Sequence, residues 1–457
     1  MSRSRLLVVV AVAITQAVFL ASLAAGQAGT AAIAGVVTDS TGSVLPGVTI
    51  AVESPALIER VRTAVTNGQG AFRIVALPPG VYSVTVTLTG FRTYRREGIE
   101  LRTGFTAPAD AVLQVGAVEE TVTVTGASPL VDVQNTQTDN VISQETLQVL
   151  PTNQNLQGFA TLTPGVSEDG FDVGGNRHER AELKMAGRPP QRLLYDGVTI
   201  NSLANDGDGK FGSYAVNVQA MQEVALGLGT MTAEYRDGGI NVNHIPKHGG
   251  NRFAGLVDVA FGNGDMQWSN LNDEFRARRV PFAAEARKTW DYAVNYGGPV
   301  ARDRLWFFGA ARWWGGQENQ PNNFFNKLDN VYIGEPFSGV VKYEPDPGRR
   351  AFTDFHFSDV TGRLTWQVAG NHKLSWGHSF QKSCICDLQV TGNVAPEATS
   401  RFVYDPMHLS HVSYTYPASN RLLVEAGFGY FHDENRGRPA DDTGARDISI
   451  LELVGTA

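Results

Sequence analysis

The chain has 457 residues, 49 of them glycine, and a formal net charge of -8 at pH 7. This length predicts two to four domains, and the negative charge argues against nucleic acid as a partner. After residue 26 no apolar run approaches the roughly 20 residues that a membrane helix needs. A role inside a membrane would therefore require a closed barrel of β-strands, in which alternate residues face a polar lumen.

The N-terminus contains the one long apolar run of the sequence. Arg3 and Arg5 precede the apolar stretch Leu6 to Leu23, and small residues follow at positions 24–26. A charged region, an apolar region and a small-residue cleavage zone are typical of a secretory signal peptide. We expect a signal peptide over residues 1–26. An uncleaved anchor helix is the alternative.

Short alternating runs separated by turn signals fill residues 33–115. They contain the strings GVVTD, LPGV, GQGAFR and LPPGVYSV, whose glycines and prolines suit turns with fixed or positive φ. Strands at this spacing predict a small β-sandwich. The pattern resembles the carboxypeptidase regulatory-like domain, which has a carbohydrate-binding-like fold, and we expect this domain over residues 30–116. No zinc-ligand motif such as His-x-x-Glu occurs there, so the resemblance implies an accessory module rather than a peptidase.

A second resemblance depends on residues 233–253, which spell AEYRDGGINVNHIPKHGGNRF. This run is similar to the junction at which the plug domain of TonB-dependent outer-membrane transporters continues into the first barrel strand. The junction residues that the resemblance implies are Tyr235, Arg236, Gly238, Gly239, Lys247, Gly249 and Gly250. The chain departs from the family at Asn241, Asn243 and His244, where apolar residues are usual. This departure leaves the register of the last plug strand open.

Residues 128–250 are expected to form an α/β plug domain. Ser143 is a suitable N-cap for a short helix that ends before Pro151, and Asn153 opens a second helix. The later run LKMAGRPPQRLLYDGVTIN resembles two plug strands, and we expect a plug turn at Asp196 and Gly197.

The segment between the sandwich and the plug, residues 117–127, contains the string VEETVTVTG, whose Thr/Val alternation is strongly β-prone. In this position it resembles a TonB box, an extended segment that a periplasmic energy-coupling protein captures by adding it to a sheet. The candidate box residues are Glu120, Thr121, Val122, Thr123, Val124, Thr125 and Gly126. Many strands meet the same requirement, so the last strand of the preceding sandwich is an equal alternative.

The residue pattern changes after residue 251, where runs that are rich in aromatic residues show alternation of apolar and polar positions. A period of two with repeated aromatic residues is typical of outer-membrane barrels. The run GGPVARDRLWFFGA, residues 297–310, resembles a barrel hairpin of Oar-like receptors. Residues 251–457 supply about seven or eight strands, whereas a plugged transporter barrel has 22. We therefore expect a C-terminally incomplete barrel in this chain.

The connections between the expected barrel strands are of two kinds. Short periplasmic turns are predicted at Asn371-His372 and Ser419-Asn420. The long polar stretches 264–288 and 315–353 are expected to be extracellular loops.

Four further motifs contain residue types that can catalyse a reaction or bind a ligand or metal. Ser379 and Lys382 match S-x-x-K of serine β-lactam-recognising enzymes, but they lie in an alternating strand without partner motifs. The acidic turn with Asn205, Asp206 and Asp208 is a weak candidate for ligand contact, since it lacks the Glu and helices of an EF-hand. Cys384 and Cys386 predict a local loop disulfide or free thiols rather than a metal site. The remaining motif is a scattered set of lumen or loop histidines: His372, His378, His408, His411 and His432.

Together these patterns predict a mainly β protein with an N-terminal β-sandwich, an α/β plug domain and the first strands of a transmembrane antiparallel β-barrel. The resemblance implies an outer-membrane receptor for energised uptake of a scarce nutrient, either a metal chelate such as a siderophore or an oligosaccharide. Its partners would be a TonB-type coupling protein and the outer-membrane assembly machinery. We expect no cofactor, no metal and no catalytic residue. The alternative is a non-transporting surface or adhesion protein that uses the sandwich as a carbohydrate-binding module.

Overall fold

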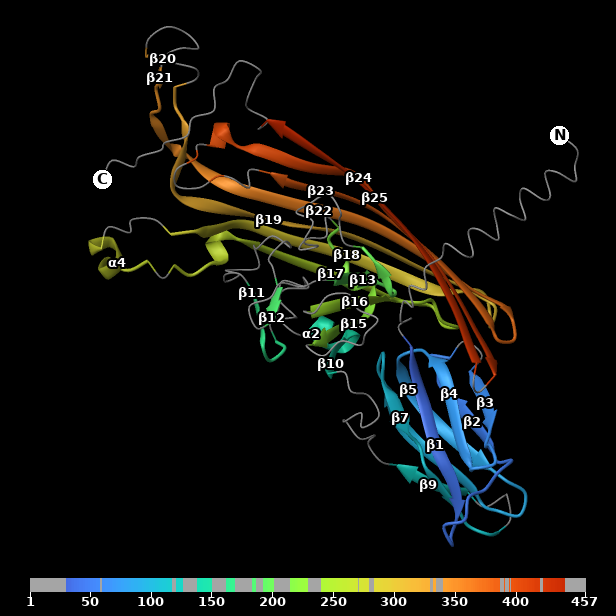
Figure 1. The fold of residues 1–457 in the computed structure, drawn as a ribbon. Coiled ribbons are helices and arrows are strands. Elements are labelled where there is room, and N and C mark those ends of the chain that lie inside the picture. The colour runs from blue at the N-terminus through green and yellow to red at the C-terminus, as the bar shows by residue number, and fades with distance from the viewer. Residues whose placement is uncertain are drawn as a thin grey trace, which may run out of the picture.

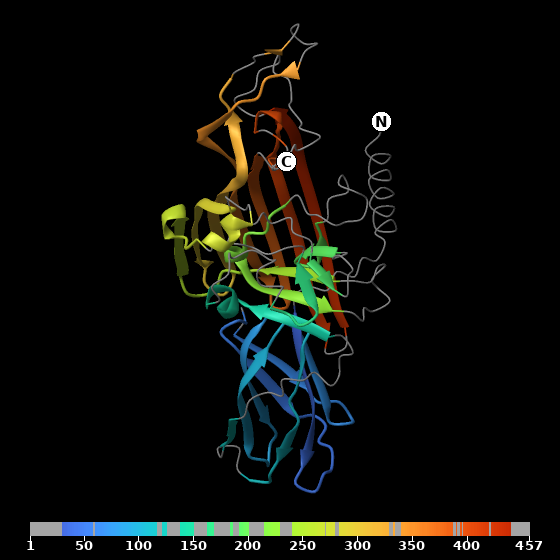
Figure 2. The same ribbon diagram turned by 90° about the vertical axis from the view of Figure 1, so that its left-hand side faces the viewer.

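The computed structural model has three parts: a β-sandwich at one end, a long curved sheet, and a smaller sheet against the concave side of the curved one (Figures 1 and 2). The structure describes residues 30–57, 60–116, 121–125, 138–149, 162–168, 183–185, 192–200, 214–228, 240–269, 271–278, 283–328, 332–333, 340–386, 390, 394, 396–419 and 422–439. The predicted signal peptide lies outside these residues.

The sandwich contains two sheets that enclose an apolar core. One sheet has the order β4-β1-β7 with β8 paired to β1, and the other has the order β3-β2-β5-β6-β9. The strands are β1 (Ala31–Asp39), β2 (Thr49–Glu53), β3 (Val61–Val65), β4 (Ala71–Leu77), β5 (Gly80–Thr87), β6 (Thr93–Leu101), β7 (Thr106–Pro108), β8 (Ala111–Leu113) and β9 (Thr121–Thr125). Ile33, Ile50, Val86 and Leu113 are among the buried residues that form the core between the two sheets. The alternation of the sequence has therefore placed one face of each strand inward.

The smaller sheet, here called the plug sheet, has the order β10-β15-β16-β13-β14. The described plug elements are β10 (Thr138–Ser143), α2 (Gln144–Val149), β11 (Val166–Glu168), β12 (Leu183–Met185), β13 (Arg192–Tyr195), β14 (Val198–Thr199), η1 (Val218–Ala220), β15 (Met221–Leu228) and β16 (Ile240–Pro246). Ser143 caps α2, because its hydroxyl accepts a hydrogen bond from the backbone N–H of Thr146 at 3.3 Å. The helix expected from Asn153 lies outside the described residues.

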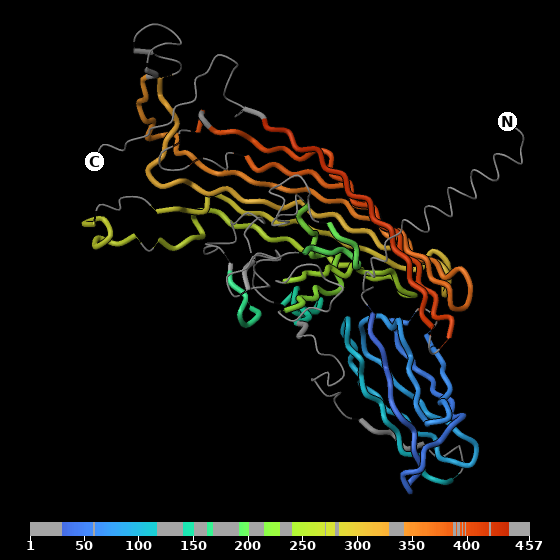
Figure 3. The backbone as a smooth tube through the Cα atoms, in the orientation of Figure 1, coloured from blue at the N-terminus to red at the C-terminus, as the bar shows by residue number. Residues whose placement is uncertain are grey.

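The long curved sheet, here called the wall, contains seven strands within the described residues, each antiparallel to the next in chain order. They are β17 (Ala254–Asn263), β18 (Glu285–Ala301), β19 (Leu305–Asn326), β22 (Pro345–Ala369), β23 (His372–Cys386), β24 (Ser400–Ser419) and β25 (Leu422–Pro439). Figure 3 shows these strands as one continuous layer, with the strands of the sandwich set at an angle beyond its end. The predicted run of barrel strands is confirmed.

Short segments near the opposite end of the wall are η2 (Gly264–Met266), α4 (Asp273–Ala277), the pair β20 (Tyr332–Ile333) and β21 (Val340–Val341), and η3 (Pro396–Ala398). No helix in the described part of the chain is both long and apolar enough to span a membrane.

The two expected long loops are partly wrong. The strand β18 already begins at Glu285, β19 continues to Asn326, and β22 begins at Pro345. These polar stretches therefore remain in the wall as paired strands, because backbone pairing does not require apolar side chains. The short turn before β23 is placed at residues 370–371, one position ahead of the predicted pair.

Adjacent residues of the wall point to opposite sides and differ sharply in exposure. Val360 is 60% exposed and Asp359 is 1% exposed, and Trp313 is 52% exposed whereas Trp314 is 6% exposed. The outer side thus carries exposed apolar side chains, while the inner side carries buried side chains, both polar and apolar, some of which meet the plug sheet. This distribution is the one that a transmembrane barrel strand needs, with lipid on one side and a filled polar interior on the other.

Candidate functional site

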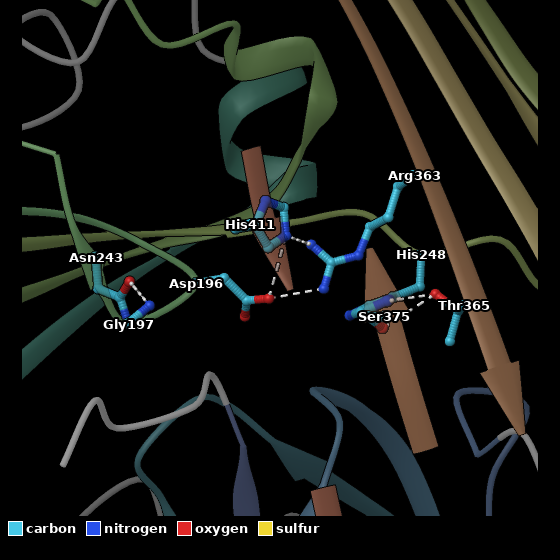
Figure 4. Close-up of polar contacts among 8 residues, drawn as sticks. All are labelled: Asp196, Gly197, Asn243, His248, Arg363, Thr365, Ser375 and His411. Atoms are coloured by element: carbon cyan, nitrogen blue, oxygen red, sulfur yellow. Dashed lines mark hydrogen bonds and ion pairs between the residues drawn. The ribbon is translucent and has the colours of Figure 1, made fainter. Parts of the chain in front are cut away.

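The candidate site is the contact between the plug sheet and the concave face of the wall. Part of this contact is apolar: Phe308, Ala310 and Leu409 of the wall join a cluster that contains Tyr195 and Leu226 of the plug sheet. The remainder consists of buried polar side chains that reach from the wall to plug backbone and side-chain atoms. Figure 4 shows one such group, at the end of the wall that faces the sandwich.

The predicted turn at Asp196 and Gly197 joins β13 to β14 as a two-residue hairpin loop. Both residues have positive φ, at 50° for Asp196 and 79° for Gly197, which suits a tight hairpin turn. The backbone N–H of Asp196 donates to the carbonyl oxygen of His244, and that of Gly197 donates to Asn243 Oδ1 at 3.1 Å. The turn is therefore anchored on β16 by polar residues of the last plug strand.

The polar residues of β16 also resolve its register. This strand pairs in parallel with β13, with Arg192 opposite Asn241 and Tyr195 opposite His244. The His244 ring is fully buried, and its Nδ1 lies 2.9 Å from the carbonyl oxygen of Leu194. Burial lowers the pKa of His244 to about 4, so the ring is neutral at ordinary pH. The departure from apolar residues thus has a structural reason, since these side chains fasten neighbouring plug strands.

The carboxylate of Asp196 is bound by Arg363 of the wall, and His411 lies beside the pair. Arg363 Nη2 donates to Asp196 Oδ2 at 2.7 Å, and His411 Nε2 lies 3.7 Å from the same oxygen (Figure 4). Arg363 Nη1 lies 2.8 Å from His411 Nε2. Because a guanidinium only donates, this ring nitrogen is the acceptor, and the histidine carries its proton on Nδ1. The three side chains form a polar network, here called the Asp196 network, between a plug turn and two wall strands, and Arg363 and Asp196 are its ion pair.

The electrostatics of the Asp196 network favour an ionised carboxylate. The side chains of Arg363 and Asp196 are only 2% and 10% exposed. Burial alone would raise the pKa of Asp196, but the positive charge of Arg363 and the contribution of His411 outweigh it, and the pKa is lowered. The plug turn is therefore held to the wall by a buried charge pair with the carboxylate ionised at neutral pH.

A neighbouring contact involves His248, just after the last plug strand. His248 Nδ1 lies 3.2 Å from Thr365 Oγ1, and Ser375 Oγ donates to the same hydroxyl at 3.4 Å (Figure 4). Burial, and then the positive charge of Arg363, hold the pKa of His248 well below its usual value. A neutral imidazole can accept a hydrogen bond from Thr365 at Nδ1 or donate one to it, depending on its tautomer.

A second network surrounds Asp359 of the wall, deeper along the plug. Asp359 Oδ1 accepts from Asn217 Nδ2 at 3.0 Å and from Thr361 Oγ1 at 2.8 Å. The Tyr214 hydroxyl donates toward Asp359 Oδ2 at 3.3 Å and lies 2.8 Å from the hydroxyl of Ser379, which donates to the same oxygen at 2.6 Å. Ser379 of the S-x-x-K string therefore belongs to a strand and takes part in a structural contact.

The junction between the plug and the wall uses two of the predicted residues. Lys247 Nζ donates to the backbone carbonyl oxygen of Gln219 at 2.9 Å, and burial lowers the pKa of Lys247 to about 8. At Gly249 a Cβ atom would lie 2.2 Å from the backbone oxygen of Phe307. Only glycine lets the chain pass this close to β19. Gly250 has no such contact within 4 Å.

A cavity of about 230 Å³ separates the sandwich from the Asp196 network. Pro55 and Pro79 line it from the sandwich side, and Asp196, His248 and Arg363 line it from the other side. The sandwich touches the plug beside it, because the backbone N–H of Thr103 donates to Glu223 Oε1 at 3.0 Å. The end of the plug that faces the sandwich is thus next to a space that water can enter.

Comparison with known proteins agrees with this architecture. Residues 32–114 match the family model of the carboxypeptidase regulatory-like domain. The TonB-dependent transporter Oar of Myxococcus xanthus is 24% identical over 420 residues, which cover 85% of this chain and 38% of the relative. These findings support an Oar-like TonB-dependent receptor.

The chain is also similar to two proteins described as receptors. A probable TonB-dependent siderophore receptor, PirA of Acinetobacter baumannii, is 25% identical over 275 residues, which cover 57% of this chain and 32% of the relative. The structure of the ferric enterobactin receptor PfeA of Pseudomonas aeruginosa gives a TM-score of 0.45 at 15% identity, with 66% of this chain and 42% of that chain covered. The chain thus spans well under half the length of the curated relatives that it matches.

Several predicted site residues lie outside the described residues of the receptor. They are Glu120 and Gly126 of the box candidate, Tyr235, Arg236, Gly238 and Gly239 of the junction, and Asn205, Asp206 and Asp208 of the acidic turn. The other box candidates, Thr121–Thr125, form the strand β9.

Arg363 and Asp359 are not predicted from the sequence as site residues, and His411 is predicted only as one of several scattered lumen or loop histidines. Each lies on the inner face of an alternating strand, where a charged residue among small polar ones was the available signal. Of the other histidines, His378, His408 and His432 form a row of neighbouring rings across three wall strands, with centroids 5.5 Å and 6.5 Å apart.

The cysteines have a local environment of their own. Cys384 and Cys386 form a disulfide at the end of β23, so the bridge lies in a strand rather than in the expected loop. The His356 ring lies beside the pair on β22.

Proposed function

We propose that this receptor takes up a scarce small nutrient across the outer membrane through a plug-gated barrel, with energy supplied by a TonB-type periplasmic protein. The observation that supports this proposal is the Asp196 network, which joins a plug turn to the inner face of the wall through buried polar groups. A permanent core would be apolar, whereas a gate needs contacts that can be exchanged for water. The ligand class is a metal chelate such as a siderophore, or an oligosaccharide.

Polar contacts suit a gate because their loss is compensated when water enters. A hydrogen bond within a protein contributes only about 0.5–1.5 kcal/mol net, because the separated groups bond to water instead. The same holds for the charges of Asp196 and Arg363 once both are hydrated. The plug can therefore be closed tightly while dry and opened at moderate cost when a pulling force admits water.

The proposed coupling segment is the box candidate, residues 117–127. The coupling protein takes Glu120 to Gly126 as an added strand, using backbone N–H and C=O groups. Force on this segment is transmitted along the chain to β10, the first described plug strand, and from there to the plug sheet. Asn205, Asp206 and Asp208 are the proposed ligand contacts.

The test compares the receptor with a variant that lacks Glu120 to Gly126, both produced in the outer membrane of the host. The readouts are binding of the purified coupling-protein periplasmic domain and cellular uptake of radiolabelled ferric siderophores and of labelled oligosaccharides. We expect the deletion to abolish both binding and energised uptake. Thr123→Ser serves as the matched control, because it keeps the backbone groups and the side-chain hydroxyl and removes only a methyl group. This variant should retain both binding and uptake.

Unchanged binding and uptake in the deletion variant would contradict the proposal. Retention of glycans by the sandwich, with no energy-dependent uptake of any probe, would instead favour the adhesion alternative.

A further inference from the structure

The box candidate is not free in this structure but forms an edge strand of the sandwich. The strand β9, with five of the seven candidate residues, pairs in parallel with β6. Thr93 lies opposite Thr121, and the pairing continues in register to Glu97 opposite Thr125. The sheet order β3-β2-β5-β6-β9 places this strand at the end of the sheet.

The sandwich module closes before β9 begins. The family model of the regulatory-like domain ends at residue 114. The chain is then fastened by two backbone hydrogen bonds, from Arg92 to Gln114 at 2.8 Å and from Gly116 to Gly90 at 3.1 Å. The strand β9 is thus an addition to a module that is already complete. Without it, β6 would present a free sheet edge, which readily accepts another strand.

The coupling protein and β6 compete for the same kind of contact. Capture by β-augmentation uses the main-chain groups of an extended segment, and those groups of Thr121 to Thr125 are partly engaged by β6. While β9 remains in the sandwich sheet, a pull on it acts on the sandwich and not on the plug. Productive coupling therefore requires the β6–β9 pair to open.

We propose that the edge of β6 from Thr93 to Glu97 is a resting-state binding site for the box, and that it competes with the coupling protein for this segment. The inference rests on the proposed function of the box. The interaction surface is the sandwich edge, its occupant is the chain's own strand β9, and the competing partner is an extended strand of a periplasmic protein. Parallel pairs are slightly less stable per residue than antiparallel ones, which favours opening of the β6–β9 pair over an antiparallel pair of the same length.

The sandwich is well placed for this role. Its Thr103 contact with Glu223 fastens it beside the plug, and Arg60 lies 3.9 Å from Asp303 in the turn between β18 and β19. The box is therefore held on a module that itself contacts the plug, although β9 pairs with the Thr93–Glu97 half of β6, away from the Thr103 contact. Release of β9 leaves the sandwich core intact, since the module is closed by residue 116.

The test uses a disulfide that fastens β9 to β6 in the full receptor. Thr93→Cys combined with Thr121→Cys links two register partners, and small side chains are replaced by one of similar size. Thr49→Cys combined with Thr87→Cys is the matched control, because it links β2 to β5 and leaves β9 free. Both variants keep the native Cys384–Cys386 pair, so any effect of the reductant on that pair appears in both.

The readout is binding of the purified coupling-protein periplasmic domain to the detergent-solubilised receptor. We expect oxidation of the Thr93/Thr121 variant to weaken binding at least tenfold and reduction to restore it, while the control binds equally in both states. Hydrogen exchange should show that the β6–β9 pair protects amides of residues 121–125 in the free receptor, and amides of residues 93–97 should lose protection when the coupling domain takes β9.

Two results would overturn the inference while leaving the proposed function in place. One is unchanged binding by the oxidised variant when deletion of Glu120 to Gly126 abolishes binding. The other is failure of Thr93/Thr121 to crosslink under conditions in which Thr49/Thr87 does so. If the deletion itself leaves binding intact, the box assignment is wrong, and both the proposed function and this inference fail.

Discussion

The sandwich and the plug–wall contact are both buried, yet they are built from different chemistry. The sandwich core is a closed apolar cluster that includes Ile33, Ile50 and Val86, all at 0% exposure. The plug–wall contact instead buries Asp196 against Arg363 and Asp359 against Asn217. Apolar burial is lost whenever water enters, whereas polar groups regain hydrogen bonds with water. The difference predicts that the plug–wall contact can exchange its hydrogen bonds for water, whereas the sandwich core cannot be wetted without losing its stabilisation.

The largest effect is expected when one half of the Asp196 network is removed. Arg363→Met leaves the Asp196 carboxylate buried without its partner, and the loss of a buried partner costs about 3–5 kcal/mol. Hydrogen exchange of the plug strands β13 and β16 should therefore accelerate strongly. Adding Asp196→Asn should recover much of the protection, because the unpaired charge is removed.

The control for that experiment is a second buried ion pair. Arg312 donates to Asp291 at 2.7 Å, and both residues belong to wall strands. Arg312→Met should accelerate exchange in β18 and β19 first. Equal acceleration of the plug by both variants would mean that Arg363 acts through the wall and not through the plug contact.

The apolar core of the sandwich can be tested at Ile50, which is fully buried in β2. Ile50→Ala should lower the free energy of unfolding of the sandwich by about 2–5 kcal/mol, from lost burial and the cavity left behind. Denaturant titration followed by exchange of β2 amides measures this. Val81→Ala, at a position that is 59% exposed, should change it little. Exchange of the plug strands should stay as in the unmodified receptor, and a loss there would show that the two regions are not independent.

Acidification should weaken the plug and leave the sandwich core nearly unaffected. The folded-state pKa values of His248 and His244 are lowered, so the unfolded chain binds more protons below about pH 6.5. The stabilisation is present above that pH and declines as pH falls toward the folded-state values, which for His244 is about 4. Each histidine should contribute about 1.4 kcal/mol of loss per pH unit in this window. Exchange of β16 at pH 7 and pH 5 measures the loss, and His248→Gln should reduce its pH dependence.

The smallest effect is expected at the surface contact between the sandwich and the wall. The side chains of Arg60 and Asp303 are 69% and 58% exposed, at 3.9 Å. Exposed pairs contribute about 0–1 kcal/mol, so Arg60→Ala should leave thermal unfolding and plug exchange almost unchanged. A large loss would indicate that this contact, rather than the hydrogen bond from Thr103 to Glu223, fastens the sandwich.

Local features of the fold were predictable from the sequence because their causes are local. Alternation gave the sandwich and wall strands, and Asp196-Gly197 identified a tight turn by its residue types alone. The partner of that turn is 167 residues away at Arg363. Finding it requires the register of the wall strands and their position relative to the plug, and neither is encoded in any short pattern.

The polar segments at 315–326 and 345–353 show the opposite failure. Polarity predicted loops, because a strand in lipid must carry apolar residues on its outer face. That requirement does not apply to the part of a barrel strand that extends beyond lipid, and in this chain the pairing of β19 with β22 continues through both polar segments. Composition therefore locates the apolar band of a barrel strand better than it locates the end of the strand.

The position of the 230 Å³ cavity predicts where the proposed separation of plug and wall would begin. Among the described residues that line it are Asp196, His248 and Arg363, whereas Asp359 is not one of them. Water that fills this space wets the Asp196 network while the deeper network is still dry. Unseating of the plug would then advance as a hydration front from the sandwich side inward, and each newly wetted contact would lower the cost of the next.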